Sequence, residues 1–359
     1  MSVLQNLSDM GYEIVLCTTE ITKEVNSICV ERGISVINIK IDFDTPINPL
    51  SKLSRLGKVK RELWKQIDLI YNDSSIIWVF SDAALKHLGK KLLKKKYILH
   101  MFELSEKTYY YYKLPILSMD MSKYAKGALR VIQAEYNRAH IVKSWWGLND
   151  LPAVLPNKPY LKKTIEKKSK ITDLIASSVI EQLKGRKIIL YQGNLGSERP
   201  LDQFIKAVDN LGDNYAFVIM SGSEDIYKHL NSENYFFIPY VTSPQHLEIT
   251  SHAYIGVMSY IPVVNGYSKL NSLYCAPNKI YEYSMFGIPM IGNDVPGLSS
   301  IFSITGSGVC IEKYDEDSIR NAILEIENNY EEMNIKSKEL YDKTDNYERI
   351  KEIIQEVSY

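Results

Sequence analysis

A lysine and a glutamate stand one turn apart near the predicted start of a helix, in the stretch APNKIYEYSMFGIPMIG (276–292). A proline suits the first turn of this helix, and a glycine ends it about nine residues later, before a buried strand. Free N–H groups near Asn278 and the charge of Lys279 form a candidate anion site, and the carboxylate of Glu282 can accept two ribose hydroxyls. The pattern predicts a bound nucleoside diphosphate. A solvated surface helix with an incidental lysine and glutamate is the alternative.

A second candidate anion site lies in the stretch YQGNLGSERPLDQFIKAV (191–208), which is predicted to run from a strand through a glycine loop into a helix. Gly193 and Gly196 allow the backbone to approach a phosphate, with Asn194 between them. Arg199 precedes the helix and can bind a phosphate bidentately. An ordinary strand-to-helix turn with a surface arginine is the alternative. Because both stretches follow strand ends, each strengthens the anion-binding interpretation of the other.

The elements that must position these residues alternate between strands and helices. Short apolar runs rich in β-branched residues predict strands, and the segments between them predict helices, which is typical of parallel sheets covered by helices. The predicted strands are 12–19, 35–41, 75–81, 96–102, 129–134, 140–145, 187–193, 215–222, 235–241, 253–260 and 288–294. The predicted helices include 50–68, 83–95, 200–210 and a helical tail over 316–359.

This alternation predicts an α/β protein with two Rossmann-like domains that face a central cleft. The first domain is expected at 1–165 and the second at 171–336, with the C-terminal helix 337–359 packing back on the first. Prolines and charges at 156–187 predict the connection between them. The chain begins inside a predicted helix, 2–11, so the opening strand of the first domain and its glycine loop are expected to be missing.

The composition is ordinary for a globular protein, with 359 residues of which 45% are hydrophobic and 24% charged. This length suits two domains of about 150–200 residues. Four cysteines without CxxC spacing favour reduced thiols in the cytoplasm over a disulfide framework or a zinc site. No apolar run approaches the roughly 18 residues of a membrane span, and no signal peptide is expected.

The net charge is zero but unevenly distributed. Residues 1–170 carry 28 Lys and Arg against 17 Asp and Glu, whereas the remainder carries 15 against 26. Two basic segments, 51–65 and 90–96, lie in the basic half. Each cation near an anionic leaflet contributes about 1 kcal/mol, so peripheral contact with an anionic membrane is expected, with a solvated basic face as the alternative. No nucleic-acid-binding module is recognisable, and nucleic acid is not an expected partner.

Three stretches together resemble bacterial GT-B glycosyltransferases of the glycosyltransferase family 4 kind. They are the two stretches above, with 276–292 extended to 276–298, and RVIQAEYNRAHIVKSWWGLNDLPAVLPNKP (130–159). The resemblance covers nearly the whole chain from residue 2 and is strongest at 187–300. It implies a nucleotide-sugar donor on the second domain, an acceptor on the first, and transfer in the cleft with retention of anomeric configuration. No metal and no cofactor are implied.

The resemblance also implies roles for individual residues. By position, Glu282 would bind the donor ribose, whereas Lys279 and Arg199 would lie near its diphosphate and act in catalysis. Asn278 would lie near the donor phosphates or sugar. Pro239 and Tyr240 follow residues 235–238 of a predicted strand and fall where backbone atoms of the family bind the base.

On the acceptor side, HMFELSEK (100–107) resembles the HxHEL stretch of the family, with Phe102 at the second histidine. His100 and Glu103 are therefore candidate catalytic residues that bind an acceptor hydroxyl. Structural hydrogen bonding by a polar pair at a strand end is the alternative. A retaining front-face reaction requires no protein base, because the donor phosphate can take the acceptor proton.

The sequence departs from the family pattern in three places. Tyr274 stands where a second glutamate is common, eight positions before Glu282, and Asn194 stands where an arginine often follows the first glycine. The missing opening strand carries a loop that lines the cleft in the family.

The resemblance thus implies a retaining, hexosyltransferase-like, metal-independent enzyme of surface polysaccharide biosynthesis, with a saccharide or lipid-linked saccharide as acceptor. Its expected place is the cytoplasm, peripheral on the inner face of the plasma membrane. Two alternatives remain open. One is a sugar-nucleotide epimerase or phosphorylase on the same fold, and the other is a partner subunit that keeps the fold and has lost turnover.

Overall fold

The computed structural model describes the chain over residues 1–39, 49–109, 118–162, 165–263 and 268–358. Parallel strands form its main sheets, which confirms the predicted α/β class. Among the described residues, no helix combines the length and the apolar character needed to cross a membrane.

The chain forms two compact units, which are described separately. Unit 1 comprises Met1–Pro156 and Asn346–Tyr359, and unit 2 comprises Asn157–Asp345. The boundary therefore lies at Pro156, nearer the N-terminus than the predicted 165. The chain returns to unit 1 at Asn346, so that of the predicted segment 337–359 only the part from Asn346 lies in unit 1.

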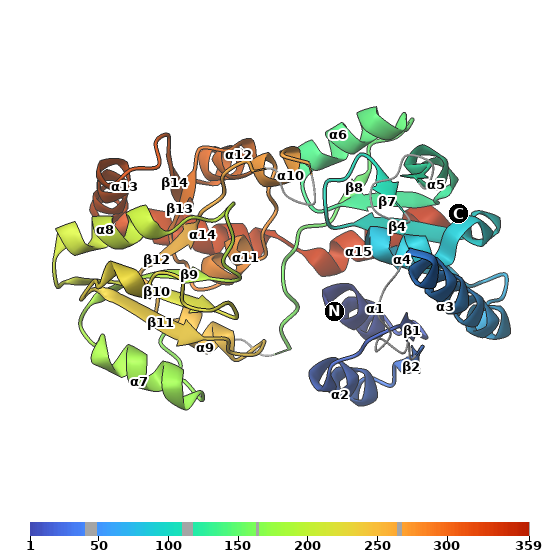
Figure 1. Ribbon diagram of the computed structural model, residues 1–359, viewed down its shortest axis with the longest axis horizontal. Coiled ribbons are helices and arrows are strands. Elements are labelled where there is room, and N and C mark those ends of the chain that lie inside the picture. The colour runs from blue at the N-terminus through green and yellow to red at the C-terminus, as the bar shows by residue number, and fades with distance from the viewer. Residues whose placement is uncertain (40–48, 110–117, 163–164, 264–267, 359) are drawn as a thin grey trace. The chain divides into compact units, whose positions relative to one another are not determined.

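Unit 2 is built on a six-stranded parallel sheet with the order β11-β10-β9-β12-β13-β14 (Figure 1). In chain order the strands are β9 (Lys187–Gln192), β10 (Tyr215–Ser221), β11 (Tyr235–Pro239), β12 (Ile255–Met258), β13 (Met290–Asn293) and β14 (Gly308–Ile311). Sequence analysis predicted all of these except β14, a four-residue edge strand whose half-buried GVCI run is a weak signal.

Helices cover both faces of this sheet because successive strand side chains point to opposite faces. Ile189 and Tyr191 of β9 pack in one apolar layer with α8 and α13, whereas Ile188 and Leu190 pack in the other with α7, α9, α11 and α12. The helices of unit 2 are α7 (Leu174–Gln182), α8 (Asp202–Leu211), η3 (Lys228–Leu230), α9 (His246–Thr250), α10 (Leu270–Leu273), α11 (Lys279–Ser284), α12 (Pro296–Thr305), α13 (Glu316–Asn328) and α14 (Tyr330–Lys343).

Unit 1 contains a four-stranded parallel sheet of order β3-β4-β7-β8, a two-stranded parallel sheet β1-β2 and a short antiparallel pair β5-β6. The strands are β1 (Val15–Thr18), β2 (Ser35–Asn38), β3 (Ile77–Phe80), β4 (Tyr97–Met101), β5 (Thr108–Tyr109), β6 (Ser118–Met119), β7 (Arg130–Gln133) and β8 (Ala153–Val154). Strand β4 is buried along its whole length, as expected for a central parallel strand.

The helices of unit 1 are α1 (Ser2–Asp9), α2 (Lys23–Glu31), α3 (Pro49–Ile70), α4 (Ser81–Leu88), η1 (Gly89–Lys94), α5 (Met121–Gly127), α6 (Tyr136–Trp146) and α15 (Asn346–Ser358). Helix α1 precedes the first strand, as the sequence predicted. It packs with α15 against the four-stranded sheet through Val3 and Leu7, and against α2 through Leu4 and Cys29.

The strand predicted at 140–145 is wrong, because these residues lie inside helix α6. The side chain of Glu135 caps this helix by accepting hydrogen bonds from the N–H groups of Asn137 and Arg138, and Gly147 ends it in a left-handed conformation. Its buried residues follow a helical spacing of three or four, which the short run HIVKSW does not reveal.

The helix expected to span about nine residues after Pro277 is also shorter than predicted. Helix α11 contains six residues and begins at Lys279, with Asn278 as its N-cap residue. So short a helix has a weak dipole. Any anion binding at this point therefore depends mainly on side chains.

Candidate functional site

The candidate donor-binding residues lie in unit 2 at the carboxyl ends of parallel strands. Strand β9 lies between β10 and β12, and the chain crosses to the opposite side of β9 after β11, so the strand order reverses between β9 and β12. In open α/β sheets, ligands bind outside the strands at such a reversal. Both predicted anion-binding stretches belong here: the loop from Gly193 follows β9, and α11 follows β12.

The side chain of Lys279 is enclosed by aromatic rings. The residue is 8% exposed, and its Nζ lies 4.1 Å from the ring centre of Tyr191 and 5.4 Å from that of Tyr260. Among the described residues, no carboxylate lies within ion-pair distance of this amine. Burial, and next the neighbouring cation of Arg199, lower the pKa of Lys279 from 10.5 to about 7, against the opposing effect of Glu282. An arriving anion would stabilise the charged form.

The glycine loop brings a second cation to the same place. The guanidinium of Arg199 lies 5.5 Å from the ring centre of Tyr260, and its Nη1 donates to the carbonyl oxygen of Asn194 at 3.3 Å. Its Nε is buried and has no hydrogen-bond partner in the described part of the chain. Arg199 and Lys279 therefore share the ring of Tyr260, and a diphosphate is an anion of suitable charge to lie near both.

Gly193 allows the loop to pass this close to the lysine. Its φ of +127° is a conformation that side-chain-bearing residues rarely adopt, and a Cβ built on it would lie 3.7 Å from Lys279 Nζ. The loop is fixed by Tyr191, whose hydroxyl donates to the carbonyl oxygen of Asn194 at 2.8 Å. Gly196 accepts a hydrogen bond from the N–H of Arg199 at 2.9 Å, which closes the turn before α8.

Glu282 belongs to a polar cluster that sequence analysis did not predict. Gln192 Nε2 donates to Glu282 Oε2 at 2.5 Å, and His246 Nε2 lies 3.5 Å from Glu282 Oε1. The hydroxyl of Thr250 donates to Gln192 Oε1 at 2.6 Å. Gln192, at the end of β9, had a visible signal, because it is a polar residue that ends an apolar strand. Nothing in the sequence marked His246 or Thr250.

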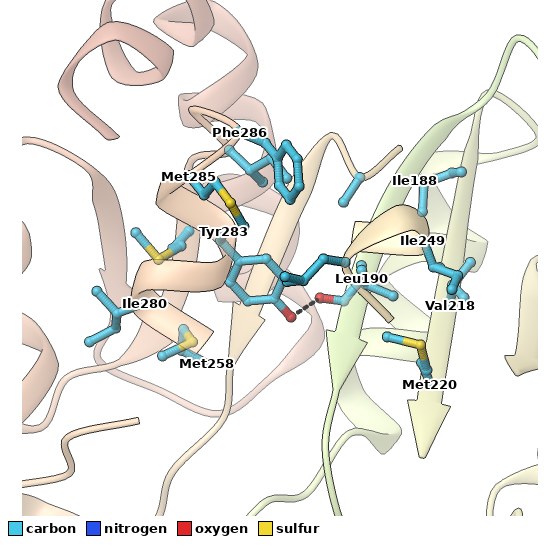
Figure 2. Close-up of a cluster of buried hydrophobic side chains, with 14 of the residues drawn as sticks. Ile188, Leu190, Val218, Met220, Ile249, Met258, Ile280, Tyr283, Met285 and Phe286 are labelled. Atoms are coloured by element: carbon cyan, nitrogen blue, oxygen red, sulfur yellow. Dashed lines mark hydrogen bonds between the residues drawn. The ribbon is translucent and has the colours of Figure 1, made fainter. Parts of the chain in front are cut away.

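Helix α11 is anchored to the sheet by its buried residue Tyr283. Figure 2 shows this ring against Leu190, whose carbonyl oxygen accepts a hydrogen bond from the tyrosine hydroxyl at 2.8 Å. The ring passes over Gly256, where a Cβ would come within 2.4 Å of it, so the absence of a side chain there makes room for the anchor. Glu282, the preceding residue, is thereby held beside the end of β9.

The remaining candidate residues of unit 2 are exposed. Tyr240, which is 66% exposed, follows β11, and a Cβ on Gly222 would lie 3.6 Å from its ring. The same Cβ would lie 3.8 Å from Asn194 Oδ1, so Tyr240 and Asn194 border the same glycine. Pro239 ends β11, and Asn278 is exposed at the start of α11.

The two acceptor-side candidates lie in unit 1. His100 is 2% exposed in the central strand β4, and its ring lies against those of Phe80 and Phe102 at 5.6 and 4.7 Å. Trp78 Nε1 donates to His100 Nδ1 at 3.4 Å, whereas His100 Nε2 is buried without a hydrogen-bond partner in the described residues. Burial, and next the N-terminal amine, lower the pKa of His100 to about 3. Glu103 is half-buried in the turn after β4.

The described residues contain no group of three or more His, Cys, Asp or Glu side chains arranged to hold a metal ion. The predicted site residues of unit 2 are thus a carboxylate, two cations and a glycine loop. Such a set is suited to a ribose and a diphosphate.

Comparison with solved structures identifies the fold as GT-B, which consists of two Rossmann-like domains. HepE from Anabaena, in complex with UDP and glucose, is 13% identical and matches with a TM-score of 0.65 over 100% of this chain and 96% of that one. A putative UDP-N-acetylglucosamine 2-epimerase from Listeria monocytogenes is 13% identical, with a TM-score of 0.60 over 98% and 89%. Sucrose-phosphate synthase from Thermosynechococcus elongatus is 14% identical, with a TM-score of 0.63 over 99% and 89%.

Residues 176–347 match the family model of glycosyl transferases group 1. This range includes β9, α11 and every candidate donor-binding residue. No curated protein sequence matches the chain. The family match thus lies almost entirely in unit 2, and the solved structures show the GT-B fold for the chain.

Proposed function

We propose that the protein is a retaining glycosyltransferase that transfers a sugar, expected to be a hexose, from a nucleotide-sugar donor to a saccharide acceptor without a metal or cofactor. Within the fold, we assign it to the family 4 kind. The observation that carries this proposal is the position of Lys279 and Arg199. Both are cations beside the ring of Tyr260, at the point where the strand order of unit 2 reverses, with Glu282 one turn into α11.

In this reaction the bond between the anomeric carbon and the donor phosphate breaks, and a bond from that carbon to the acceptor oxygen forms on the same face. The acceptor proton passes to the departing phosphate oxygen, so no protein base is needed. Negative charge grows on the diphosphate as it leaves. Lys279 and Arg199 would stabilise that charge more strongly in the transition state than in the bound donor, which is the condition for faster turnover.

We assign acceptor binding to unit 1, where Nε2 of His100 has no hydrogen-bond partner within the described residues and lies beside the turn that carries Glu103. Because its pKa is low, His100 is uncharged at neutral pH. With Trp78 donating to Nδ1, the proton of the neutral ring lies on Nε2. This N–H can donate to a sugar hydroxyl. It cannot accept the proton that such a hydroxyl releases.

We further propose a lipid-linked acceptor in surface polysaccharide assembly, with unit 1 on an anionic membrane face. The two basic segments meet in the structure, where Lys91 pairs with Asp68 of α3 and lies 4.8 Å from the ring centre of Trp64. Exposed lysines accompany two exposed apolar residues at the end of α3, Leu69 and Ile70. Co-sedimentation with phosphatidylglycerol vesicles but not with phosphatidylcholine vesicles would support this placement, and binding to neither would exclude it.

The direct test of the donor site is a thermal-shift screen against UDP-, GDP- and dTDP-sugars, followed by a transfer assay with the donor that stabilises the protein. A ligand at 100 times its Kd stabilises the folded state by about 2.7 kcal/mol. Lys279→Ala and Glu282→Ala are expected to abolish most of the stabilisation and the transfer. If both variants transfer sugar as the parent does, the site is wrongly assigned. Nucleotide-sugar binding without turnover would favour the partner-subunit alternative.

A sugar-nucleotide epimerase is the second candidate, because one structural neighbour carries that name. Incubation of the protein with the stabilising nucleotide-sugar and no acceptor separates the two activities. An epimerase converts the nucleotide-sugar alone, which NMR of the anomeric and ring protons detects. The transferase we propose leaves it unchanged until an acceptor is added.

A further inference from the structure

The carboxylate of Glu282 is held from two sides by residues of other elements. Gln192 at the end of β9 donates to Oε2 at 2.5 Å, and His246 of α9 lies 3.5 Å from Oε1. An ionised carboxylate has about four lone-pair sites, two on each oxygen. Each oxygen of Glu282 therefore keeps room for one further donor, which is the number that the two hydroxyls of a ribose require.

The amide of Gln192 is held between Glu282 and Thr250. Gln192 is 3% exposed and Thr250 is fully buried, and the hydroxyl of Thr250 donates to Gln192 Oε1. A flipped amide would turn its oxygen towards the carboxylate and its NH₂ group towards this hydroxyl, and would lose the hydrogen bond to Glu282. The carboxylate of Glu282 only accepts hydrogen bonds, and the Thr250 hydroxyl, which also lies 3.0 Å from the carbonyl oxygen of His246, donates at the shorter distance to Gln192 Oε1. Together they keep the donating end of the amide on the carboxylate.

These contacts are not needed to attach α11 to the sheet. Tyr283 already anchors the helix through its hydrogen bond to the carbonyl oxygen of Leu190 (Figure 2). Its ring also fits closely over Gly256. The separate hydrogen bond from Gln192 and the neighbouring ring of His246 therefore orient the glutamate side chain, which is 12% exposed at the edge where the strands end.

We propose that Gln192, oriented by Thr250, and His246 are positioning residues that make the site selective for a ribose over a 2′-deoxyribose nucleotide. This inference rests on the proposed nucleotide-binding function and adds the groups that fix its sugar selectivity. An oriented carboxylate can accept hydrogen bonds from both ribose hydroxyls at once. A carboxylate that rotates freely binds a sugar with one hydroxyl nearly as well as a sugar with two. The selectivity should therefore depend on the orienting groups as well as on Glu282.

The test compares ribose and deoxyribose diphosphates by titration calorimetry on the full chain, with UDP against dUDP and GDP against dGDP. The parent protein is expected to bind the preferred ribonucleotide about tenfold or more tightly than its deoxy counterpart, because a hydroxyl bonded to a carboxylate is lost. Gln192→Leu and the isosteric Thr250→Val are expected to reduce this ratio to about threefold or less. His246→Leu should reduce it, and His246→Gln, which keeps a donor, should restore it.

Gln203→Leu is the matched control, since Gln203 also donates to a carboxylate of unit 2, that of Asp202 at 2.8 Å, but does not contact Glu282. It should leave the ratio unchanged. Thermal melting of each variant shows whether it remains folded, and Thr250→Val, which keeps the side-chain volume, preserves the test if Gln192→Leu unfolds.

The outcomes separate this inference from the function on which it rests. If the parent prefers the ribonucleotide and the variants keep that preference while both affinities fall equally, Gln192 and Thr250 are merely structural and the inference is overturned. A parent that binds both sugars equally also overturns it, although nucleotide binding stands. A parent that binds dTDP but none of these four diphosphates overturns the inference as well. A parent that binds none of the four and no nucleotide-sugar of the thermal-shift screen contradicts the proposed function itself.

Discussion

Each of the two units buries one basic side chain among aromatic rings, and the two differ in what that burial does. Lys279 of unit 2 lies beside Tyr191 and Tyr260, and His100 of unit 1 lies beside Phe80 and Phe102. Burial is the main cause of a lowered pKa in both. It leaves Lys279 with a pKa of about 7 and His100 with a pKa of about 3.

The difference follows from the starting values and from the neighbours. A lysine begins at 10.5, and the carboxylate of Glu282 opposes part of the lowering, so Lys279 remains close to half protonated at neutral pH. A histidine begins at 6.5, and the N-terminal amine adds to the effect of burial, so His100 stays neutral. Unit 2 therefore holds a partly protonated lysine, and an arriving anion would stabilise its charged form. Unit 1 holds an uncharged ring that is buried.

The largest effect is expected from Lys279→Met, which removes the charge and keeps much of the length. Transfer should fall by about 10²–10³ because one group that stabilises the leaving diphosphate is lost. Steady-state kinetics with the preferred donor measures the change. Lys184→Met, at an exposed lysine of the same unit, is the control and should retain the parental rate. If Lys279→Met transfers sugar as fast as Lys184→Met, the charge of Lys279 does not act in catalysis, and the functional difference between Lys279 and His100 disappears.

The pH dependence of the free energy of unfolding tests the burial of His100. The unfolded chain binds a proton at His100 below pH 6.5, whereas the folded chain binds it only near pH 3, so the free energy of unfolding should fall as the pH decreases between these values. The slope from this group approaches about 1.4 kcal/mol per pH unit. Urea unfolding at pH 7, 6 and 5 should show that this share of the slope is absent in His100→Phe. If the variant loses stability in parallel with the parent, the histidine is not buried as described.

The pH dependence of nucleotide affinity sharpens the comparison at Lys279. Above pH 7 the free protein loses the lysine proton, and an anion that binds the charged form must restore it, so Kd should rise with pH by up to about tenfold per unit. Calorimetry at pH 8 in two buffers of different ionisation enthalpy should detect proton uptake on binding. Lys279→Met should bind weakly with neither signature. An affinity of the parent protein that is constant from pH 7 to 8.5 would contradict a pKa of about 7.

The smallest effect concerns the loop beside the lysine. Gly193 and Gly212 both have positive φ, but a side chain at Gly212 would meet nothing within 4 Å, whereas one at Gly193 would approach Lys279. Alanine at either position should cost of order 1 kcal/mol of stability through backbone strain. Only Gly193→Ala should also weaken UDP or GDP binding, as measured by calorimetry. A loss of affinity in both variants would attribute the effect to general destabilisation.

Much of the fold could be predicted because the strands of a parallel sheet are continuous apolar runs. Strands β9 to β13 and most strands of unit 1 were indicated in this way. The error at 140–145 arose because HIVKSW is a short run in which strand and helix patterns coincide, and the capping contacts of Glu135 that determine the helix lie outside it. The short length of α11 likewise depended on packing, since its residues continue into a turn that ends at Gly287.

The candidate site shows the same division. Its charged residues and glycines were recognised from local spacing, because Arg199 follows a glycine loop and Lys279 precedes Glu282 by three positions. The residues that set their pKa and orientation were not recognised. Tyr191 and Tyr260 lie far from Lys279 in the chain, and His246 lies far from Glu282. Local spacing carries no record of contacts between residues so far apart.

The sequence by itself determined which elements form, that they alternate as in parallel sheets, and that cations and a carboxylate follow the strand ends, since these depend on the period of apolar residues and on short-range turn chemistry. Only the tertiary structure decided that Lys279 is buried between tyrosine rings and that Gln192 and His246 hold Glu282. Burial and hydrogen bonding across a sheet depend on which strands become neighbours, and the pKa and orientation of a side chain follow from those neighbours.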